Sequence, residues 1–66
     1  MTIRDNIILD KPFDQQKFDY AIKYSAMESD LQMFDEGANR LLADGASNLS
    51  GGQRTRVTLA RALYQE

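Results

Sequence analysis

A serine and two glycines directly before an amphipathic helix place the strongest constraint on this chain. Ser50, Gly51 and Gly52 precede residues 54–64, where apolar side chains recur at helical spacing. Serine is a preferred N-cap, because its hydroxyl accepts a hydrogen bond from a free amide of the first turn. Glycine lacks the Cβ atom that would keep a ligand away from the backbone. Free amides and the helix dipole then favour an anion at this helix start.

Two arginines near the start of the same helix support an anion site. Arg54 and Arg56 oppose the helix dipole, so local helix stability does not account for them. An arriving polyanion, such as a nucleotide phosphate, would account for both. The alternative is that Ser50 caps an ordinary helix with flexible glycines after it. The helix also has a wide apolar face that needs cover on more than one side, formed by Val57, Leu59, Ala60, Leu63 and Tyr64.

Composition excludes several classes of site. The 66 residues include no cysteine and no histidine, so disulfides and the usual zinc sites are absent. Residues 1–49 carry five Lys or Arg and nine Asp or Glu, a net charge of −4, whereas residues 50–66 carry three arginines and one glutamate, a net charge of +2. Three arginines are too few for a nucleic-acid surface, so we expect no DNA or RNA partner.

Two helices are expected in the first part of the chain. Thr2 and Asp5 have the spacing of a capping box, which predicts a short helix through about Ile8. Asp14 is the expected N-cap of a longer helix over about residues 15–26. Ile3 and Ile7 lie four residues apart and share one face of the first helix. In the second, a narrow buried stripe is expected from Phe18, Ala21, Ile22 and Ser25.

Four aromatic residues belong to this second helix or its approach. Phe13 and Phe18 occupy the positions of a hydrophobic staple across the helix start. Tyr20 and Tyr24 lie four residues apart on a neighbouring face, where tyrosines commonly cover the core and keep their hydroxyls in water. A docking surface is the alternative interpretation of this tyrosine pair.

A third, short helix and a loop fill the middle of the chain. Ser29 and Gln32 have capping-box spacing, and Gly37 is placed to stop the helix in the left-handed conformation. Residues 41–42 are expected to be extended and buried, and residues 44–45 to form a turn. Apolar residues expected to pack inward or fill gaps here are Met27, Leu31, Met33 and Phe34. The predicted fold is mainly α, with three to four short helices in one small unit.

The run Leu49-Ser50-Gly51-Gly52-Gln53, followed by Arg-x-Arg-Val-x-Leu-Ala-Arg-Ala, resembles the signature motif of ATP-binding cassette (ABC) ATPases. Residues 2–7 resemble the T-I-x-x-N-I segment that opens the helical subdomain of this family. The later segments that resemble the family are residues 14–27, 30–37, 42–49 and 59–65. Essentially the whole chain is covered, and it is most similar to the C subfamily, the multidrug-resistance-associated proteins and the cystic fibrosis conductance regulator.

The resemblance implies an excised helical subdomain of a P-loop ABC ATPase, with residues 1–48 as the subdomain and residues 49–66 as the signature motif and its helix. The chain has no G-x-x-x-x-G-K-[ST] loop and no strand with the family's magnesium-binding aspartate and catalytic glutamate. No catalytic residue and no metal ligand is therefore expected within it, and it should not hydrolyse ATP alone. Ala43 and Ala46 stand where the family has glycines, which puts the conformation of that loop in doubt.

The resemblance also implies where a nucleotide would bind. The Ser50 hydroxyl and the Gly51 and Gly52 amides would face the γ-phosphate of ATP held by a partner ATPase domain, and Gln53 would order the loop and contact the nucleotide. The implied cofactors are ATP and Mg²⁺ in the intact protein, with neither bound to this chain alone. The implied partners are a second nucleotide-binding domain and the rest of the chain's own ATPase core.

A contact with transmembrane domains is implied as well. Leu9 matches the surface where the family docks its coupling helices, and Asp44 belongs to a loop on the same side, although glutamate is commoner at that position. The chain would then work at the cytoplasmic face of a membrane, as a soluble piece of a transporter. For Leu9, a lone exposed leucine is the alternative.

Two other functions stay open. The chain could be a stand-alone helical interaction module with Leu9, Tyr20 and Tyr24 as its contact patch. It could also bind a nucleotide by itself, although one helix start without a P-loop or a basic cradle would bind ATP poorly. Because its last helix has a wide apolar face, we expect the isolated chain to be loose or to self-associate.

Overall fold

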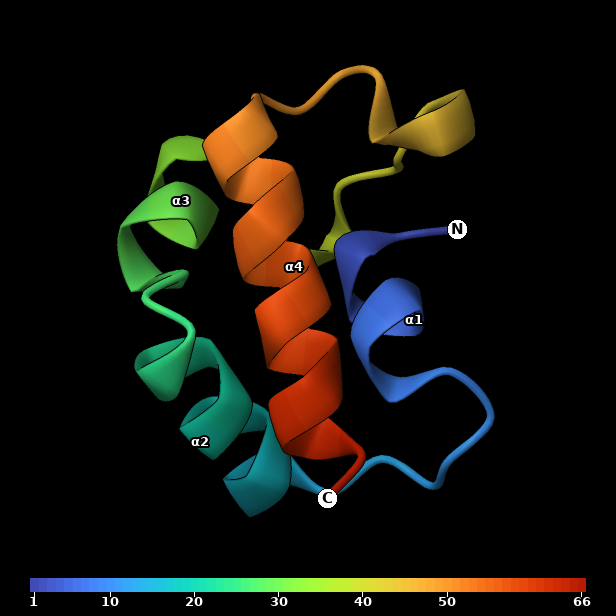
Figure 1. Cartoon of the computed structure of the whole chain (residues 1–66), viewed down its shortest axis with the longest axis vertical. Coiled ribbons are helices and arrows are strands. Elements are labelled where there is room, and N and C mark those ends of the chain that lie inside the picture. The colour runs from blue at the N-terminus through green and yellow to red at the C-terminus, as the bar shows by residue number, and fades with distance from the viewer.

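The computed structural model describes all 66 residues, and its helices are arranged around the last one (Figure 1). In chain order the elements are α1 (Ile3–Ile8), α2 (Gln15–Tyr24), α3 (Glu28–Met33), the 3₁₀ turns η1 (Gly37–Asn39) and η2 (Asp44–Ala46), and α4 (Gly51–Tyr64). In Figure 1, α4 is central, with α1 on one side and α2 and α3 on the other. The only β-type pairing is one antiparallel bridge between Thr2 and Leu41. The expected mainly α fold is confirmed.

The core lies between α4 and the helices on its two sides. Its ten buried apolar side chains are Ile3, Ile7, Phe18, Ala21, Ile22, Met27, Leu49, Val57, Ala60 and Tyr64. From α4, Val57, Ala60 and Tyr64 follow helical spacing on one face. Leu59, expected in the same face, is 45% exposed, because about 100° per residue turns it nearly opposite to Val57. The buried face of α4 is therefore narrower than predicted.

The predicted helix starts are confirmed where the signal is local. Thr2 and Asp5 form the capping box of α1, and Asp14 accepts amide hydrogen bonds at the start of α2. The rings of Phe13 and Phe18 pack with their centroids 5.6 Å apart, as the staple requires. Helix α2 ends at Tyr24, two residues earlier than predicted, because Ala26 has a positive φ of 62°.

The predicted start of α3 is wrong. The helix begins at Glu28, its N-cap is Met27 without a side-chain cap, and Ser29 lies inside it. The Met27 amide donates to the Ile22 carbonyl and the Met27 carbonyl accepts from Leu31, so a buried methionine joins the two helices directly. This short connection leaves no room for a separate serine cap.

Three smaller expectations in the middle of the chain also need correction. Gly37 has the predicted left-handed conformation, with φ of 56°, but α3 has already ended at Met33 because Phe34 is extended. Met33 is 75% exposed and fills no gap. Leu41 is extended as predicted but 69% exposed, since its backbone rather than its side chain faces Thr2.

Candidate functional site at the start of helix α4

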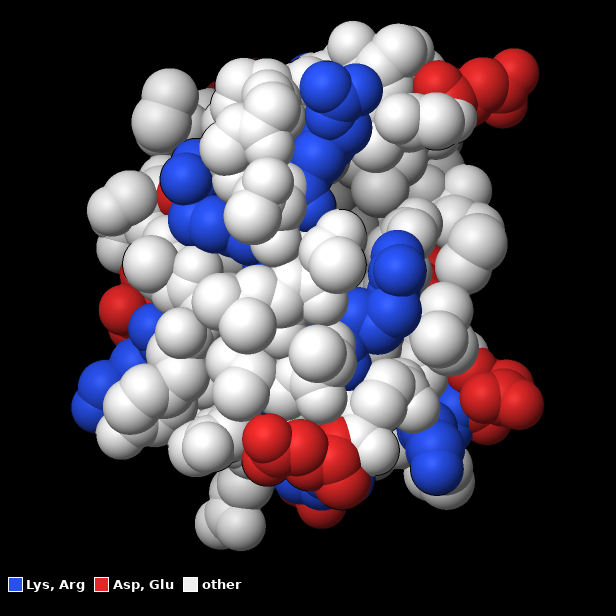
Figure 2. Space-filling view, viewed as in Figure 1, with Lys and Arg blue, Asp and Glu red and all other residues white.

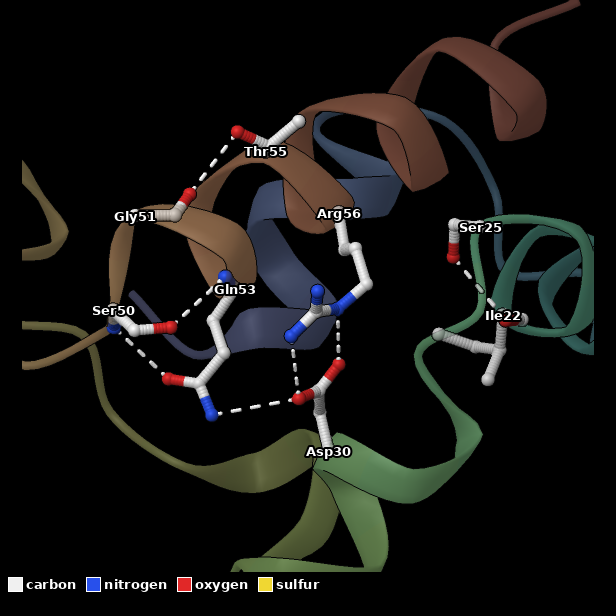
Figure 3. A network of polar contacts seen from close by, with 8 residues as sticks. All are labelled: Ile22, Ser25, Asp30, Ser50, Gly51, Gln53, Thr55 and Arg56. Atoms are coloured by element: carbon white, nitrogen blue, oxygen red, sulfur yellow. Dashed lines mark hydrogen bonds and ion pairs between the residues drawn. The ribbon is translucent and has the colours of Figure 1, made fainter.

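A reciprocal capping box shapes the start of α4 (Figure 3). The Gln53 amide donates to the Ser50 hydroxyl oxygen at 3.1 Å, and the Ser50 amide donates to the Gln53 side-chain oxygen at 3.0 Å. The amides of Gly51 and Gly52 donate to no group of the chain, and both glycines are exposed. Two free donors therefore lie beside a serine hydroxyl at the positive end of a 14-residue helix.

The two glycines differ in their surroundings. A Cβ atom added at Gly51 would meet no atom within 4 Å, so this position opens directly to solvent. A Cβ atom at Gly52 would lie 3.1 Å from a terminal guanidinium nitrogen of Arg56. The backbone at Gly52 is therefore closely flanked by a cationic group.

Arg56 is held by a carboxylate from another helix. Its Nε donates to Oδ2 of Asp30 at 2.6 Å and its Nη2 to Oδ1 at 2.9 Å, and the amide nitrogen of Gln53 lies 3.4 Å from the same Oδ1 (Figure 3). Asp30 is only 6% exposed. The hydrogen bond from Arg56 lowers the pKa of Asp30 despite the opposing effect of burial, so the carboxyl group is charged at neutral pH.

This pair corrects the interpretation of the two arginines. Arg56 has a partner within the chain, so no arriving anion is needed to explain it. Arg54 is exposed, and its guanidinium makes no hydrogen bond or ion pair. Figure 2 shows two basic side chains over the upper, N-terminal half of α4, others beside its middle and near the lower edges, and acidic side chains toward the lower end and the edges.

The sequence analysis did not identify Asp30. It is 26 residues from Arg56, and it is one of nine acidic residues in residues 1–49, so spacing gives no signal. One indirect signal exists: an arginine that opposes the helix dipole needs a compensating anion, and a carboxylate of the same chain can supply it. No group of acidic side chains in the structure is placed to hold a metal ion.

The other end of α4 is held by contacts with the backbone of the first helix and its connection. Arg61 donates from Nε to the carbonyl oxygen of Asn6 at 2.8 Å. The Gln65 side chain donates to the carbonyl oxygens of Ile7 and Ile8, both at 3.1 Å. These bonds satisfy the carbonyls of Asn6 and Ile7 at the C-terminal end of α1, and the Ile8 carbonyl also accepts from the Lys11 amide.

Tyr64 adds a contact with the segment that joins α1 to α2. Its hydroxyl donates to the Pro12 carbonyl oxygen at 2.7 Å and accepts from the Asp14 amide at 2.9 Å. Leu9 lies in this segment, 47% exposed, with φ of 54° and ψ of −124°, a region that side chains rarely adopt. Asp44 begins η2 and is exposed.

The two predicted coupling residues are not adjacent. Figure 1 places both the beginning of the α1–α2 connection and η2 on the same side of α4 as α1, at opposite ends of α1. A hollow of about 430 Å³ lies beside η2 and α4, and both Asp44 and Arg54 line it. None of the helices has the length and apolar character required to span a bilayer.

Sequence comparison shows which known proteins the chain is similar to. No protein-family model matches the chain. The chain is 48% identical over 63 residues to the ABC-type transporter cctS of Talaromyces islandicus, 42% identical over 65 residues to the multidrug resistance protein mrp-7 of Caenorhabditis elegans, and 40% identical over 65 residues to human ATP-binding cassette sub-family C member 4. These alignments cover 96%, 98% and 98% of the chain, which spans only 4%, 4% and 5% of the three relatives. Over nearly its whole length, the chain thus matches a segment of ABC transporters, and of their C subfamily in particular.

Proposed function

We propose that this chain is the helical and signature-motif part of a nucleotide-binding domain in an ABC transporter. In this role Ser50, Gly51 and Gly52 face the γ-phosphate of ATP that is bound to a second nucleotide-binding domain. The observation that carries the proposal is the pair of exposed, unused glycine amides at the start of α4, within a sequence that matches ABC transporters along almost the entire chain. Fixed donors aimed at phosphoryl oxygens stabilise the charge that develops during transfer.

The residues present fit one face of an ATP site and not a whole site. The helix start offers backbone donors, a hydroxyl and the free Arg54, which suit phosphate oxygens. The chain has no P-loop lysine, and no group of acidic side chains suits Mg²⁺. Under this proposal the rest of ATP and the Mg²⁺ ion are held by the partner domain, and Gln53 orders the segment and contacts the nucleotide.

We further propose that Leu9 and Asp44 contact the transmembrane domains, at the cytoplasmic face of the membrane. Leu9 is exposed and has a backbone conformation that is costly for a side chain. The segment around it is held from both sides by Gln65 and Tyr64. Strained, exposed apolar residues on a fixed segment suit a docking contact.

A stand-alone interaction module is the second candidate. Tyr20 and Tyr24 are 46% and 60% exposed, and their ring centroids are 4.7 Å apart. In Figure 1, however, α2 and the beginning of the segment that follows α1 lie on opposite sides of α4, so Leu9 does not extend this tyrosine pair into one patch. Leu9, Tyr20 and Tyr24 therefore do not form the single contact patch that this candidate requires.

The test of the phosphate contact uses a chimera in which this chain replaces the matching residues of human ATP-binding cassette sub-family C member 4. Gly51→Asp is the sharpest change, because its Cβ meets nothing within the chain and aspartate suits the first turn of a helix. Gly52→Asp is the companion change, although its side chain would also meet Arg56. Both variants should fold and load ATP on the P-loop, yet lose turnover by about a hundredfold or more.

The matched control for these variants is Ser29→Asp, which adds the same charge to the exposed first turn of α3. It should leave both ATP binding and turnover unchanged. Unchanged turnover in Gly51→Asp would show that Ser50 and the glycines only cap a helix.

The coupling contact is tested in the same chimera with Leu9→Asp. This variant should retain ATP binding and lose assembly or transport, because a charge replaces an apolar docking residue. Normal transport by Leu9→Asp would show that Leu9 does not contribute to the contact with the transmembrane domains.

A further inference from the structure

Asp30 connects the start of α4 to the rest of the fold. Only two polar residues of the chain are buried, Ser25 and Asp30. Ser25 is satisfied locally, since its hydroxyl donates to the Ile22 carbonyl at 3.2 Å. Asp30 instead accepts from two side chains of α4, Gln53 and Arg56 (Figure 3). Its contacts are therefore directed at the segment that carries the free amides.

The contact with Gln53 fixes the direction of an amide. A carboxylate can only accept hydrogen bonds, so Asp30 selects the orientation in which the Gln53 amide nitrogen faces it. The Gln53 oxygen then faces the Ser50 amide, which it binds at 3.0 Å. If the amide turned over, the Ser50 amide would meet a second donor. Asp30 thereby maintains the capping box from a distance of 23 residues along the chain.

The contact with Arg56 fixes the position of a cation. Two parallel N–H···O bonds hold the planar guanidinium in one geometry. In that geometry it lies beside Gly52, close enough that an added Cβ would be 3.1 Å away. Without Asp30, the guanidinium would be free to move over the glycine amides or into solvent.

Stability alone does not explain why a carboxylate occupies this place. The Asp30 side chain is 9% exposed and that of Arg56 is 35% exposed. Replacement of ion pairs inside a protein by apolar residues of similar size is often neutral or stabilising. In some proteins a buried polar or charged group serves to select one conformation among several. Here the selected conformation is that of Ser50 and the two glycines.

We propose that Asp30 is a positioning residue for the phosphate-facing segment: through Gln53 and Arg56 it holds Ser50, Gly51 and Gly52 in the conformation that receives the nucleotide. The proposal rests on the proposed function of that segment and adds a residue to it. Asp30 touches no substrate and acts only through its two partners on α4. Its loss should therefore lower the rate of the chemical step more than the binding of ATP to the P-loop.

The test is Asp30→Asn in the chimera with human ATP-binding cassette sub-family C member 4, with turnover normalised to folded protein. The expected result is a kcat lowered about tenfold with a nearly constant KM for ATP, a smaller loss than the hundredfold that a misplacement of one ångström can cause. Amide hydrogen exchange of residues 50–54 should rise in the same variant. Glu28→Gln, which removes an exposed carboxylate from the same helix, should change neither quantity.

Arg56→Lys is the second variant, for the case that Asp30→Asn does not fold. It keeps the charge and loses the two-pronged contact, so kcat should fall in the same direction and by less. Full turnover per folded molecule in Asp30→Asn or, failing that, in Arg56→Lys overturns the role of Asp30.

The two proposals fail in different ways. If Gly51→Asp loses turnover and Asp30→Asn keeps full turnover, the positioning role of Asp30 is wrong and the phosphate-facing role of the segment stands. Full turnover in Gly51→Asp removes the phosphate-facing role of the segment, whatever Asp30→Asn does.

Discussion

The two ends of α4 are held in different ways. The C-terminal end is buried at Ala60 and Tyr64, and its polar side chains bind backbone groups of the α1 region. The N-terminal end begins with exposed glycines, and side chains from α3 reach it only through Asp30. Backbone partners are present whatever the neighbouring sequence, whereas the contact at the open end depends on one carboxylate.

This difference suits a helix that has one fixed end and one exposed end. The fixed end holds the segment with Leu9, and the open end offers the free amides of Gly51 and Gly52. If both proposed contacts are correct, α4 is the single rigid element that lies between them. Changes at the fixed end should therefore affect folding, and changes at the open end should affect the nucleotide contact.

The largest effect is expected at the fixed end. Tyr64→Ala removes a side chain that is 1% exposed, which typically costs about 3–5 kcal/mol for a large aromatic residue. Tyr64→Phe keeps the ring and leaves the Pro12 carbonyl and the Asp14 amide without their partner, at a cost of about 1–3 kcal/mol. Urea or thermal unfolding followed by circular dichroism measures both.

Leu59→Ala is the control for this end, because Leu59 lies on the same helix and is 45% exposed. Its effect should stay within about 0.5 kcal/mol, as for most surface substitutions. Equal losses in Tyr64→Ala and Leu59→Ala would contradict the view that the C-terminal end is the fixed one.

A smaller effect is expected at the open end on acidification. The pKa of Asp30 lies below its ordinary value of 3.8 in the folded chain, chiefly because Arg56 donates to it. Its contribution to stability is therefore complete above that ordinary value and is lost as the pH falls through the lower, folded value. On acidification, the protection of the amides of residues 50–56, taken relative to their intrinsic exchange rate at each pH, should fall before that of residues 60–65.

Asp30→Asn separates this effect from the titration of other carboxyl groups. The variant should show lower protection of residues 50–56 already at neutral pH, and a flatter dependence of that protection on pH. An acid response of the variant identical to that of the unmodified chain would mean that Asp30 does not control the open end.

Local patterns predicted most of the helix starts. Thr2, Asp14 and Ser50 were each identified as N-caps, because a capping residue and the amide that it binds lie within three residues of each other. The same reasoning failed at Ser29, because a cap pattern does not reveal that buried Met27 already joins the helix to α2. A capping signal is therefore informative only where packing leaves it free to act.

Contacts between distant residues could not be predicted. The Asp30–Arg56 pair spans 26 residues and the Tyr64–Asp14 contact 50, so each requires the relative placement of two helices. Periodicity placed Leu59 in the buried face of α4, because a pattern cannot show how many sides of a helix the fold covers. The γ-phosphate contact and the looseness of the isolated chain stay predictions.

Alanine at the two glycines should have a small, stabilising effect, and it sharpens the comparison within the open end itself. Gly51→Ala should stabilise the chain by about 0.4–1 kcal/mol, because its φ suits a helix, the added Cβ meets nothing, and the unfolded chain loses freedom. Gly52→Ala should gain less, because its Cβ presses on Arg56 and so strains the contact with Asp30.

If the segment only caps a helix, chimeras with either alanine should keep full turnover. If its bare amides receive a phosphate, both should be at least as stable as the parent and slower, with Gly52→Ala the slower of the two. Thermal unfolding and turnover are therefore measured on the same samples. Unchanged turnover at equal or higher stability indicates a helix cap, and lower turnover at equal or higher stability indicates the nucleotide contact.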